Sequence, residues 1–267
     1  MTDQKSLVQS QFGASAAAYS TSKVHAKGAS LGRLVELVKP EKHWRALDVA
    51  TGAGHTAAAF APHVASVVAS DITPEMLGEA QKLAKAKGFA NMTTAAADAE
   101  ALPFPDKSFE LVTCRIAPHH FPNVKAFVGE VARVLTPGGT FALVDNISPD
   151  NLSTPGFSAA ELQEAAAAYN AFEKLRDPSH GRALAISEWL GLIEAADLNV
   201  AHQERLPKDM EFQDWAVRMG CTRETIATLR GMLTGASPAL GAFLKPRSAG
   251  EDIHFTLDEA LIIARKG

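Results

Sequence analysis

Apolar and polar positions alternate in blocks along residues 1–150, and each block has the period of a strand or of a helix. Continuous apolar runs bounded by turn residues predict five strands, at residues 44–50, 64–70, 92–97, 108–116 and 140–147. Apolar side chains three or four positions apart predict helices at residues 23–39, 55–61, 73–88 and 124–135. The strands show little polar alternation, which is typical of strands covered on both faces. Strands that alternate with helices predict a doubly wound, parallel α/β sheet.

The pattern changes after residue 149. It predicts helices at 158–175 and 187–196, a strand at 199–206, short helices at 212–220 and 222–235, and a final strand at 254–266. We expect the last two strands to complete a mostly parallel, seven-stranded sheet. We also expect a single domain with three parts, which are an N-terminal helical cap (1–43), a cofactor-binding core (44–150), and a C-terminal half (151–267) with a helical lid around 207–250.

Residues 46–57, with the sequence ALDVATGAGHTA, join the first predicted strand to the first core helix through a Gly-x-Gly turn. Gly52 and Gly54 let the backbone come close to a ligand, and the helix N-terminus that follows attracts an anionic group. Asp71 ends the second predicted strand, where a carboxylate can accept hydrogen bonds from a ribose. These features predict a nucleoside-bearing cofactor at the carboxyl edge of the sheet.

Two cofactors suit this motif. The spacing of residues 52–57 loosely matches a dinucleotide fingerprint, which implies NAD. Three features favour S-adenosylmethionine. Asp48 lies inside the first strand, where its carboxylate would stabilise a sulfonium or ammonium, directly or through water; alternatively, Asp48 orients the loop. Asp98 follows the third strand, where it can accept from an adenine amine, and a Pro-Gly-Gly turn at 137–139 precedes the fifth strand.

Residues 47–149 resemble the core of class I S-adenosylmethionine-dependent methyltransferases, and within them the UbiE-like, type 11 branch that methylates small molecules. The segments that carry the resemblance are LDVATGAGHTA, VVASDITPEML, AADAEALPFPDKSFELVTCRIAPHHF and EVARVLTPGGTFALVD. They cover a little over a third of the chain. The resemblance implies the Rossmann-like methyltransferase fold and S-adenosylmethionine as cofactor.

The resemblance also implies a set of cofactor contacts. The methionine end would be lined by Ala50, Thr51, Gly52 and Gly54. The other contacts would be Asp71 at the ribose, Ile72 on the adenine, Asp98 and Ala99 at the adenine edge, the backbone of Arg115 at the amine, and Tyr19 as a cap. Ala50 stands where the family usually has the first glycine of the loop, so the loop could sit differently here. Plain structural roles also stay open: a tight turn for the glycines, a helix cap for Asp71, a surface acid for Asp98 and a packed aromatic for Tyr19.

His119 and His120 follow the fourth predicted strand, at the end that faces the reacting methyl group in this fold. A neutral imidazole, with an ordinary pKa near 6.5, can remove a proton from the methyl acceptor. Alternatively, both histidines stabilise the loop or pack on the cofactor. We expect no metal site, because adjacent histidines cannot easily aim at one ion and no third ligand lies at a recognisable spacing.

Composition narrows the partners and the location. The formal net charge is −4 and no basic block stands out, so we do not expect a nucleic-acid partner. Cys114 and Cys221 form no CxxC pair, which fits a reducing compartment. The first residues lack the apolar core of a signal peptide, and no apolar run is long enough to span a bilayer. We therefore expect a cytoplasmic monomer or homodimer that acts on a small molecule.

The sequence thus favours methyl transfer from S-adenosylmethionine to a small-molecule acceptor. An aromatic or quinone-like acceptor would suit a wall of apolar side chains from the insertion, although these residues could equally form a core: Phe212, Trp215, Met219, Met232, Leu233 and Phe243. Two alternatives remain at this point. One is an NAD-linked oxidoreductase on a similar fold, and the other is a non-catalytic protein that binds S-adenosylmethionine.

Overall fold

The structure of the protein, a computed structural model, describes residues 4–20 and 29–267, and only the backbone of residues 14, 15 and 17–20. The chain divides into two compact units. Unit 1 consists of Met1–Asp145, Gly191–Glu204 and Leu261–Gly267, and unit 2 consists of Asn146–Leu190 and Arg205–Ala260. The expected single domain with a helical lid stays a prediction.

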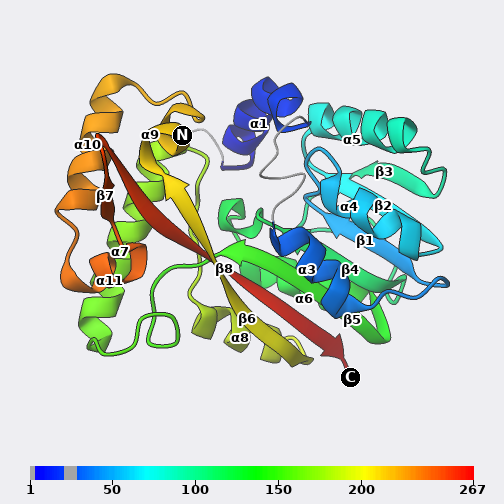
Figure 1. The fold of residues 1–267 in the computed structure, drawn as a ribbon. Helices are drawn as coiled ribbons and strands as arrows, with labels where there is room; N and C mark the ends of the chain where they lie inside the picture. The colour runs from blue at the N-terminus through cyan, green and yellow to red at the C-terminus, as the bar shows by residue number, and fades with distance from the viewer. Residues whose placement is uncertain (1–3, 21–28) are drawn as a thin grey trace. The chain divides into compact units, whose positions relative to one another are not determined.

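One sheet contains the strands in the order β3-β2-β1-β4-β5-β8-β6 (Figure 1). Its members are β1 (Arg45–Val49), β2 (Ser66–Asp71), β3 (Met92–Ala96), β4 (Phe109–Arg115), β5 (Leu135–Asn146), β6 (Leu198–Glu211) and β8 (Asp252–Lys266). The pairs β1–β2, β1–β4, β2–β3 and β4–β5 are all parallel. The predicted seven-stranded, mostly parallel sheet is therefore confirmed. An eighth strand, β7 (Arg247–Ala249), pairs with the start of β8 as an antiparallel hairpin.

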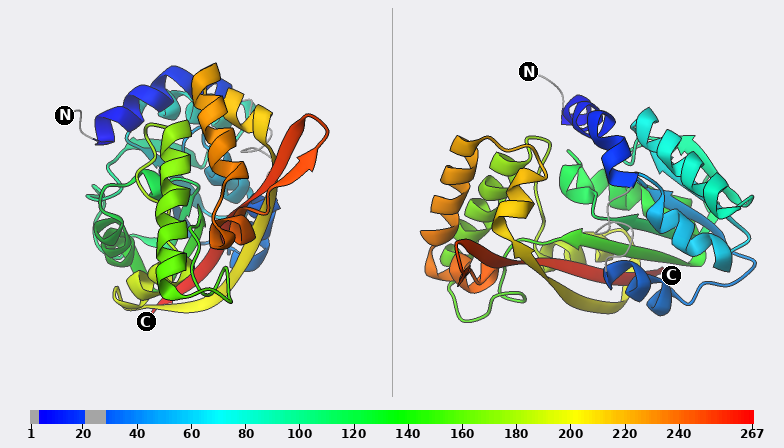
Figure 2. Two further views of the ribbon diagram at one scale, coloured as in Figure 1. Left: turned by 90° about the vertical axis from the view of Figure 1, so that its left-hand side faces the viewer. Right: turned by 45° about the horizontal axis from the view of Figure 1, so that its top comes forward.

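Helices cover both faces of the sheet, as doubly wound folds require (Figure 2). Among its described residues, unit 1 contains the helices α1 (Gln4–Ser20), α3 (Ala29–Val38), α4 (His55–Phe60), α5 (Pro74–Lys87) and α6 (Val124–Val134), with short 3-10 turns η1 (Ala61–His63) and η2 (Pro118–His120). α8 (Ile186–Glu194) has residues in both units. α3 is the described part of the helix predicted at 23–39, of which residues 23–28 lie outside the described residues.

Local sequence explains where α5 begins and ends. Pro74 occupies its first turn, where proline fits because that N–H has no intrahelical acceptor. Gly88 closes the helix in the left-handed conformation with φ +72. Thr73 occupies the N-cap position of α5, but its hydroxyl makes no capping bond. The Thr73 N–H instead donates to the Asp71 carboxylate at 2.8 Å.

The expected turn at residues 137–139 is wrong in one respect, because β5 already begins at Leu135. The register passes from Phe109–Leu135 to Leu111–Thr140, so the Pro-Gly-Gly segment is a bulge inside the strand. Gly138 has φ +73, which glycine adopts without strain. Composition alone predicts that such a segment is a turn between a helix and a strand.

Unit 2 has its own aromatic core. Its helices are α7 (Ala159–Arg176), α9 (Phe212–Val217), α10 (Arg223–Thr234) and α11 (Pro238–Leu244). The Phe172 ring stacks on Trp215 with centroids 4.8 Å apart, and the edge of Tyr169 meets Phe243 at 5.4 Å. Four of the six residues considered for an acceptor wall belong to this core, with exposures of 0 or 1 %: Phe212, Trp215, Leu233 and Phe243. These four side chains pack in the interior of unit 2, which agrees with the alternative that they form a core.

Candidate cofactor-binding and catalytic site

The loop from β1 to α4 has a glycine-like backbone. Ala50, Gly52 and Gly54 have φ values of +51, +55 and +85. The Thr51 N–H donates to the Ser70 carbonyl on β2 at 2.9 Å, and the Gly54 N–H donates to the Thr51 carbonyl at 3.0 Å. A left-handed backbone costs a non-glycine residue about 1–2 kcal/mol, so Ala50 is strained at the end of β1. The alanine therefore adopts the conformation that glycine would take at this position.

The two glycines of the loop have different surroundings. A Cβ built on Gly54 would lie 2.8 Å from the Ala80 Cβ and 2.9 Å from the Met92 Cε. Gly54 therefore allows α4 to pack closely against α5 and β3. A Cβ built on Gly52 would meet no heavy atom within 4 Å. The loop is thus closed on the side of Gly54 and open on the side of Gly52, where a ligand has room.

Asp48 lies behind this loop with 1 % of its surface exposed. Its carboxylate accepts from the Thr51 hydroxyl, from the Thr113 hydroxyl at 2.6 Å and from the Ala57 N–H at 3.1 Å. Burial raises the pKa of Asp48 to about 6, although these hydrogen bonds and the charge of Arg115 oppose the shift. The carboxylate thus ties together the loop, the first turn of α4 and strand β4.

The raised pKa of Asp48 predicts a pH-dependent contribution to stability. The pKa of Asp48 is about 6 in the folded state, above its ordinary value of 3.8. The stabilisation of the folded state that this difference provides is therefore complete when the pH lies below 3.8. That contribution, roughly 3 kcal/mol at 1.36 kcal/mol per pKa unit, is lost as the pH rises toward and through 6. Urea unfolding of wild type and Asp48→Asn between about pH 4 and 8 measures it. We expect the free energy of unfolding of wild type, relative to Asp48→Asn, to fall as the pH rises. The exposed control Asp197→Asn should show no such trend. A difference between wild type and Asp48→Asn that does not change with pH would contradict this prediction.

Asp71 ends β2 and is 8 % exposed. One carboxylate oxygen accepts from the Gly52 N–H at 2.9 Å, and the other accepts from the Thr73 N–H at 2.8 Å. Burial raises the pKa of Asp71 above its ordinary value. A carboxylate oxygen has two lone pairs, so these bonds do not use up its capacity to accept. Asp71 therefore joins the loop to the start of α5 and can still receive hydroxyl donors.

The N-terminal helix α1 docks at the next part of this edge. Lys5 Nζ lies 2.6 Å from Asp98 Oδ2 and 2.7 Å from Glu100 Oε2. Gln9 donates from its amide to the Ile72 carbonyl at 2.8 Å. These contacts place α1 against two of the residues for which the resemblance implies adenine contacts.

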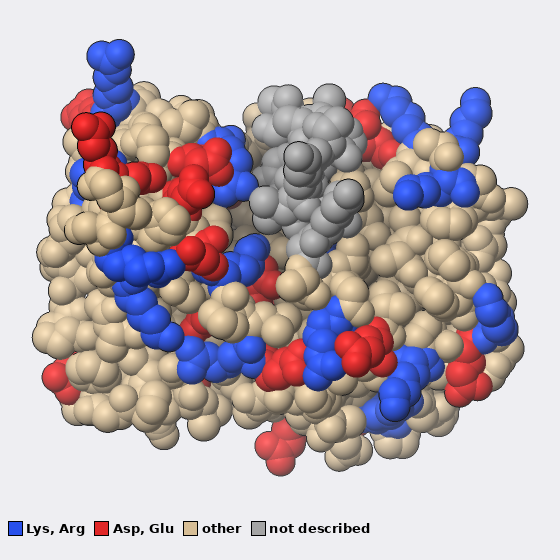
Figure 3. Space-filling view, viewed as in Figure 1, with Lys and Arg blue, Asp and Glu red and all other residues tan. Residues whose placement is uncertain are grey.

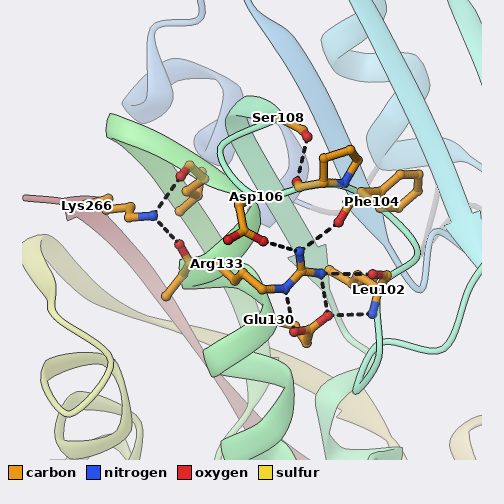
Figure 4. Close-up of polar contacts among 10 residues, drawn as sticks. Leu102, Phe104, Asp106, Ser108, Glu130, Arg133 and Lys266 are labelled. Atoms are coloured by element: carbon orange, nitrogen blue, oxygen red, sulfur yellow. Dashed lines mark hydrogen bonds and ion pairs between the residues drawn. The ribbon is translucent and has the colours of Figure 1, made fainter.

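The segment after Asp98 is held by Arg133 on α6 (Figure 4). Its guanidinium donates to the Leu102 carbonyl at 2.9 Å, to the Phe104 carbonyl at 2.8 Å and to Asp106 at 2.8 Å. Glu130 accepts from both Arg133 and the Leu102 N–H at 2.7 Å. The carboxylates of Asp106 and Glu130 neutralise the charge of Arg133. This network therefore fixes the path of the chain between β3 and β4.

The remaining residues implied as cofactor contacts lie around the same edge. Ile72 and Ala99 are half-buried. Arg115, at the end of β4, donates from Nε to the Thr56 hydroxyl at 3.0 Å, so its side chain braces α4. Tyr19 belongs to the last turn of α1, whereas the sequence placed it before the first helix; its side chain lies outside the described residues.

The two histidines form the turn η2 after β4, and each is 7 % exposed. His119 Nδ1 lies 2.6 Å from Asp145 Oδ1 at the end of β5. The His119 and His120 rings are 4.2 Å apart, and the Phe12 ring of α1 meets His120 edge-on at 5.0 Å. The sequence did not identify Asp145, because its pairing with His119 depends on β4 and β5 being neighbours. The signal in the sequence that could have identified Asp145 was its position as an acid at the end of a strand predicted to be buried.

The charges of this edge suit a cationic ligand. Burial and the charges of Asp145, Asp48 and Asp71 raise the pKa of the Cys114 thiol well above its ordinary value, which places three buried carboxylates around that strand. A pyrophosphate would be repelled by carboxylates at this point, whereas a sulfonium and an ammonium would be stabilised. Together with the open side of the loop at Gly52, the residues present fit S-adenosylmethionine.

Comparison with known proteins decides the family. Residues 47–143 match a family model described as a methyltransferase domain. The uncharacterized methyltransferase YcgJ of Bacillus subtilis is 37 % identical over 212 residues, which are 79 % of this chain and 79 % of the relative. This chain belongs to the methyltransferases. A crystal structure described as a methyltransferase from Bacillus halodurans matches it with a TM-score of 0.82 and 36 % identity, covering 90 % of this chain and 99 % of that chain.

The resemblance to the UbiE-like branch is also confirmed. A demethylmenaquinone methyltransferase of Thermus thermophilus is 37 % identical over 115 residues, which are 42 % of this chain and 52 % of the relative. The methyltransferase is an enzyme that uses S-adenosylmethionine as its cofactor. The predicted methyl transfer from S-adenosylmethionine is therefore confirmed, and it is favoured over an NAD-linked oxidoreductase and over a non-catalytic binding protein. The aromatic or quinone-like acceptor stays a prediction.

The described residues also bear on partners. None of their helices is both long and apolar enough to cross a membrane. On the face drawn in Figure 3, basic side chains lie beside acidic ones. In unit 2, for example, Lys208 pairs with Glu259 at 2.7 Å and Arg230 with Asp252 at 3.4 Å. The absence of a nucleic-acid partner stays a prediction, as do the oligomeric state and the cytoplasmic location.

Proposed function

We propose that this methyltransferase transfers the methyl group to an aromatic, quinol-like small molecule, with His119 as the general base. The observation that carries the proposal is a buried imidazole, held against Asp145 at 2.6 Å, at the same carboxyl edge as the β1–α4 loop. The likeness to a demethylmenaquinone methyltransferase supports the acceptor class. Conversion of a quinol carbon or hydroxyl to its methylated form releases a proton, which requires a base.

In the proposed site, the loop of residues 50–54 holds the methionine end of the cofactor. Asp71 accepts from the ribose hydroxyls, and Ile72 packs on the adenine. Asp98 and Ala99 meet the adenine edge, and the Arg115 backbone meets the amine. When bound, S-adenosylmethionine supplies an electrophilic methyl group on a cationic sulfur. The chain contributes alignment of the acceptor and exclusion of water.

For Asp48 we propose a positioning role instead of a direct contact. Its three hydrogen bonds all go to the loop, α4 and β4, and only 1 % of its surface is exposed. A carboxylate in this position stabilises the loop geometry from behind and contributes negative potential toward the sulfonium. Tyr19 remains a proposed cap of the site on the strength of the resemblance alone.

The acceptor is tested by labelled methyl transfer. Methyl-labelled S-adenosylmethionine is incubated with the chain and a panel of reduced naphthoquinols, catechols, phenols and primary amines. We expect label in the quinol or phenol class. We also expect His119→Ala to slow transfer by about 10²–10⁴-fold, the usual share of a general base, and the neighbouring control His120→Ala to slow it less. Label found only in amines, or full activity of His119→Ala, would contradict the proposal.

A further inference from the structure

We infer that Asp145 is a positioning residue that fixes the tautomer of His119, so that the lone pair lies on Nε2. This inference rests on the proposed role of His119 as the base. It concerns a residue that the sequence motifs did not single out.

Topology brings the two residues together. Strands β4 and β5 are parallel neighbours, with Cys114 opposite Leu143 and Arg115 opposite Val144. Both strands therefore end at the same edge. Asp145 is the residue after Val144, and His119 lies in the short turn that follows β4. The resulting Nδ1–Oδ1 distance of 2.6 Å is that of a strong, charge-assisted hydrogen bond.

Because both side chains are buried, a polar contact kept only for packing would cost folding stability. The side chains of His119 and Asp145 are 8 % and 1 % exposed. A buried carboxylate is unfavourable unless it is hydrogen-bonded and paired, and an apolar pair of similar volume is often at least as stable. A chain that needed only to fasten η2 to β5 would gain as much from apolar side chains. The pair supplies an oriented imidazole, which apolar side chains cannot.

The chemistry of the carboxylate sets the tautomer. An ionised aspartate only accepts hydrogen bonds, so the imidazole nitrogen that faces it carries the proton. In neutral His119 the proton therefore lies on Nδ1 and the lone pair on Nε2. The His120 ring is tilted against the His119 ring, with the two centroids 4.2 Å apart, and restricts rotation of the His119 imidazole. Asp145 thus holds His119 as a base whose accepting nitrogen has a defined identity.

The test reads the tautomer directly and needs no methyl acceptor. The chain is labelled with ¹⁵N at histidine, and two-bond ¹⁵N–¹H spectra are recorded at increasing pH until the His119 shifts no longer change, where its imidazole is neutral. The His119→Gln spectrum assigns the resonances. In wild type we expect the shift of a protonated nitrogen at Nδ1 and the far-downfield shift of a lone-pair nitrogen at Nε2. In Asp145→Asn we expect these two shifts to exchange wholly or in large part, because an amide can donate to Nδ1.

A second acid–histidine pair in this chain provides the control. His254 Nδ1 lies 3.2 Å from Asp209, whose side chain is 55 % exposed. We expect Asp209→Asn to leave the His119 shifts unchanged. A wild-type His119 protonated at Nε2 would overturn the inference even if Asp145→Asn did not fold, and so would a folded Asp145→Asn with wild-type His119 shifts. Failure of methyl transfer to quinols, with the expected tautomer present, would overturn the proposed acceptor but not the role of Asp145.

Discussion

Gly54→Ala is expected to lose about 2–5 kcal/mol of folding stability, from about 1–2 kcal/mol of left-handed strain and about 1–3 kcal/mol of overpacking. The new Cβ would lie 2.8 Å from the Ala80 Cβ and 3.0 Å from its backbone Cα, which cannot rotate away. This loss is a large share of the roughly 5–15 kcal/mol that stabilises a typical domain. Urea unfolding followed by circular dichroism measures it.

Gly52→Ala is the matched control, because it has the same strain without the collision. Its φ is +55 and its Cβ would meet no heavy atom within 4 Å. We expect a loss of only about 1–2 kcal/mol. Since the added methyl group would enter the open side of the loop, we expect it to raise the dissociation constant for S-adenosylhomocysteine at least about tenfold. Equal stability losses in the two variants, or wild-type affinity in Gly52→Ala, would contradict our description of the loop.

Asp71→Asn is expected to weaken binding of S-adenosylhomocysteine by about 10–100-fold, the effect of losing about 1.5–3 kcal/mol of charged hydrogen bonding. The buried carboxylate already orders the loop through the Gly52 N–H at 2.9 Å, so the same change could act through the loop alone. A cofactor analogue without the ribose 2′-hydroxyl separates these effects. Calorimetric titration of both ligands into both proteins completes a double-mutant cycle.

The expected cycle shows strong coupling. Wild type should prefer the natural ligand over the 2′-deoxy analogue, and Asp71→Asn should have lost most of that preference. Asp98→Asn serves as the comparison, because the side chain of Asp98 is 33 % exposed and already paired with Lys5. It should keep the preference for the ribose hydroxyl and lose only a few-fold in affinity. If Asp71→Asn still distinguished the two ligands as wild type does, Asp71 would not contact the ribose.

The core of the fold could be predicted because its signals are local and agree with one another. The helix at 73–88 illustrates this, with a proline in its first turn, an apolar stripe and a closing glycine. The parallel direction of β1–β5 followed from the alternation of strands and helices. The bulge at 137–139 could not be predicted, because the same Pro-Gly-Gly composition also makes an ordinary turn.

The sequence predicted a helical cap over residues 1–43 but placed its helix at 23–39, and there is a physical reason why it did not locate α1. The face of α1 that docks on the rest of unit 1 carries Lys5, Gln9 and Phe12, four and three positions apart, and two of these are polar. Ala16, 4 % exposed, adds only a small apolar surface. A helix that docks through polar side chains has no apolar stripe, so periodicity does not reveal it.

The candidate site shows the same division. The glycines and the acid at the end of β2 stand in a motif whose chemistry is readable from residue type and order. The pair of His119 and Asp145 lies 26 positions apart and depends on which strands are neighbours. The positioning role that we propose for Asp48 rests on its burial, and the sequence pattern left its burial open.

We propose that the carboxyl edge of β1, β2 and β4 holds the adenosyl and methionine parts of the cofactor. The most direct measurement is a crystal structure of the chain with S-adenosylhomocysteine. Our account predicts ligand density against the open side of Gly52, with the ribose hydroxyls on Asp71 and the adenine edge at Asp98. Density at another part of the chain, with Asp71 bonded only to the backbone of Gly52 and Thr73, would contradict it.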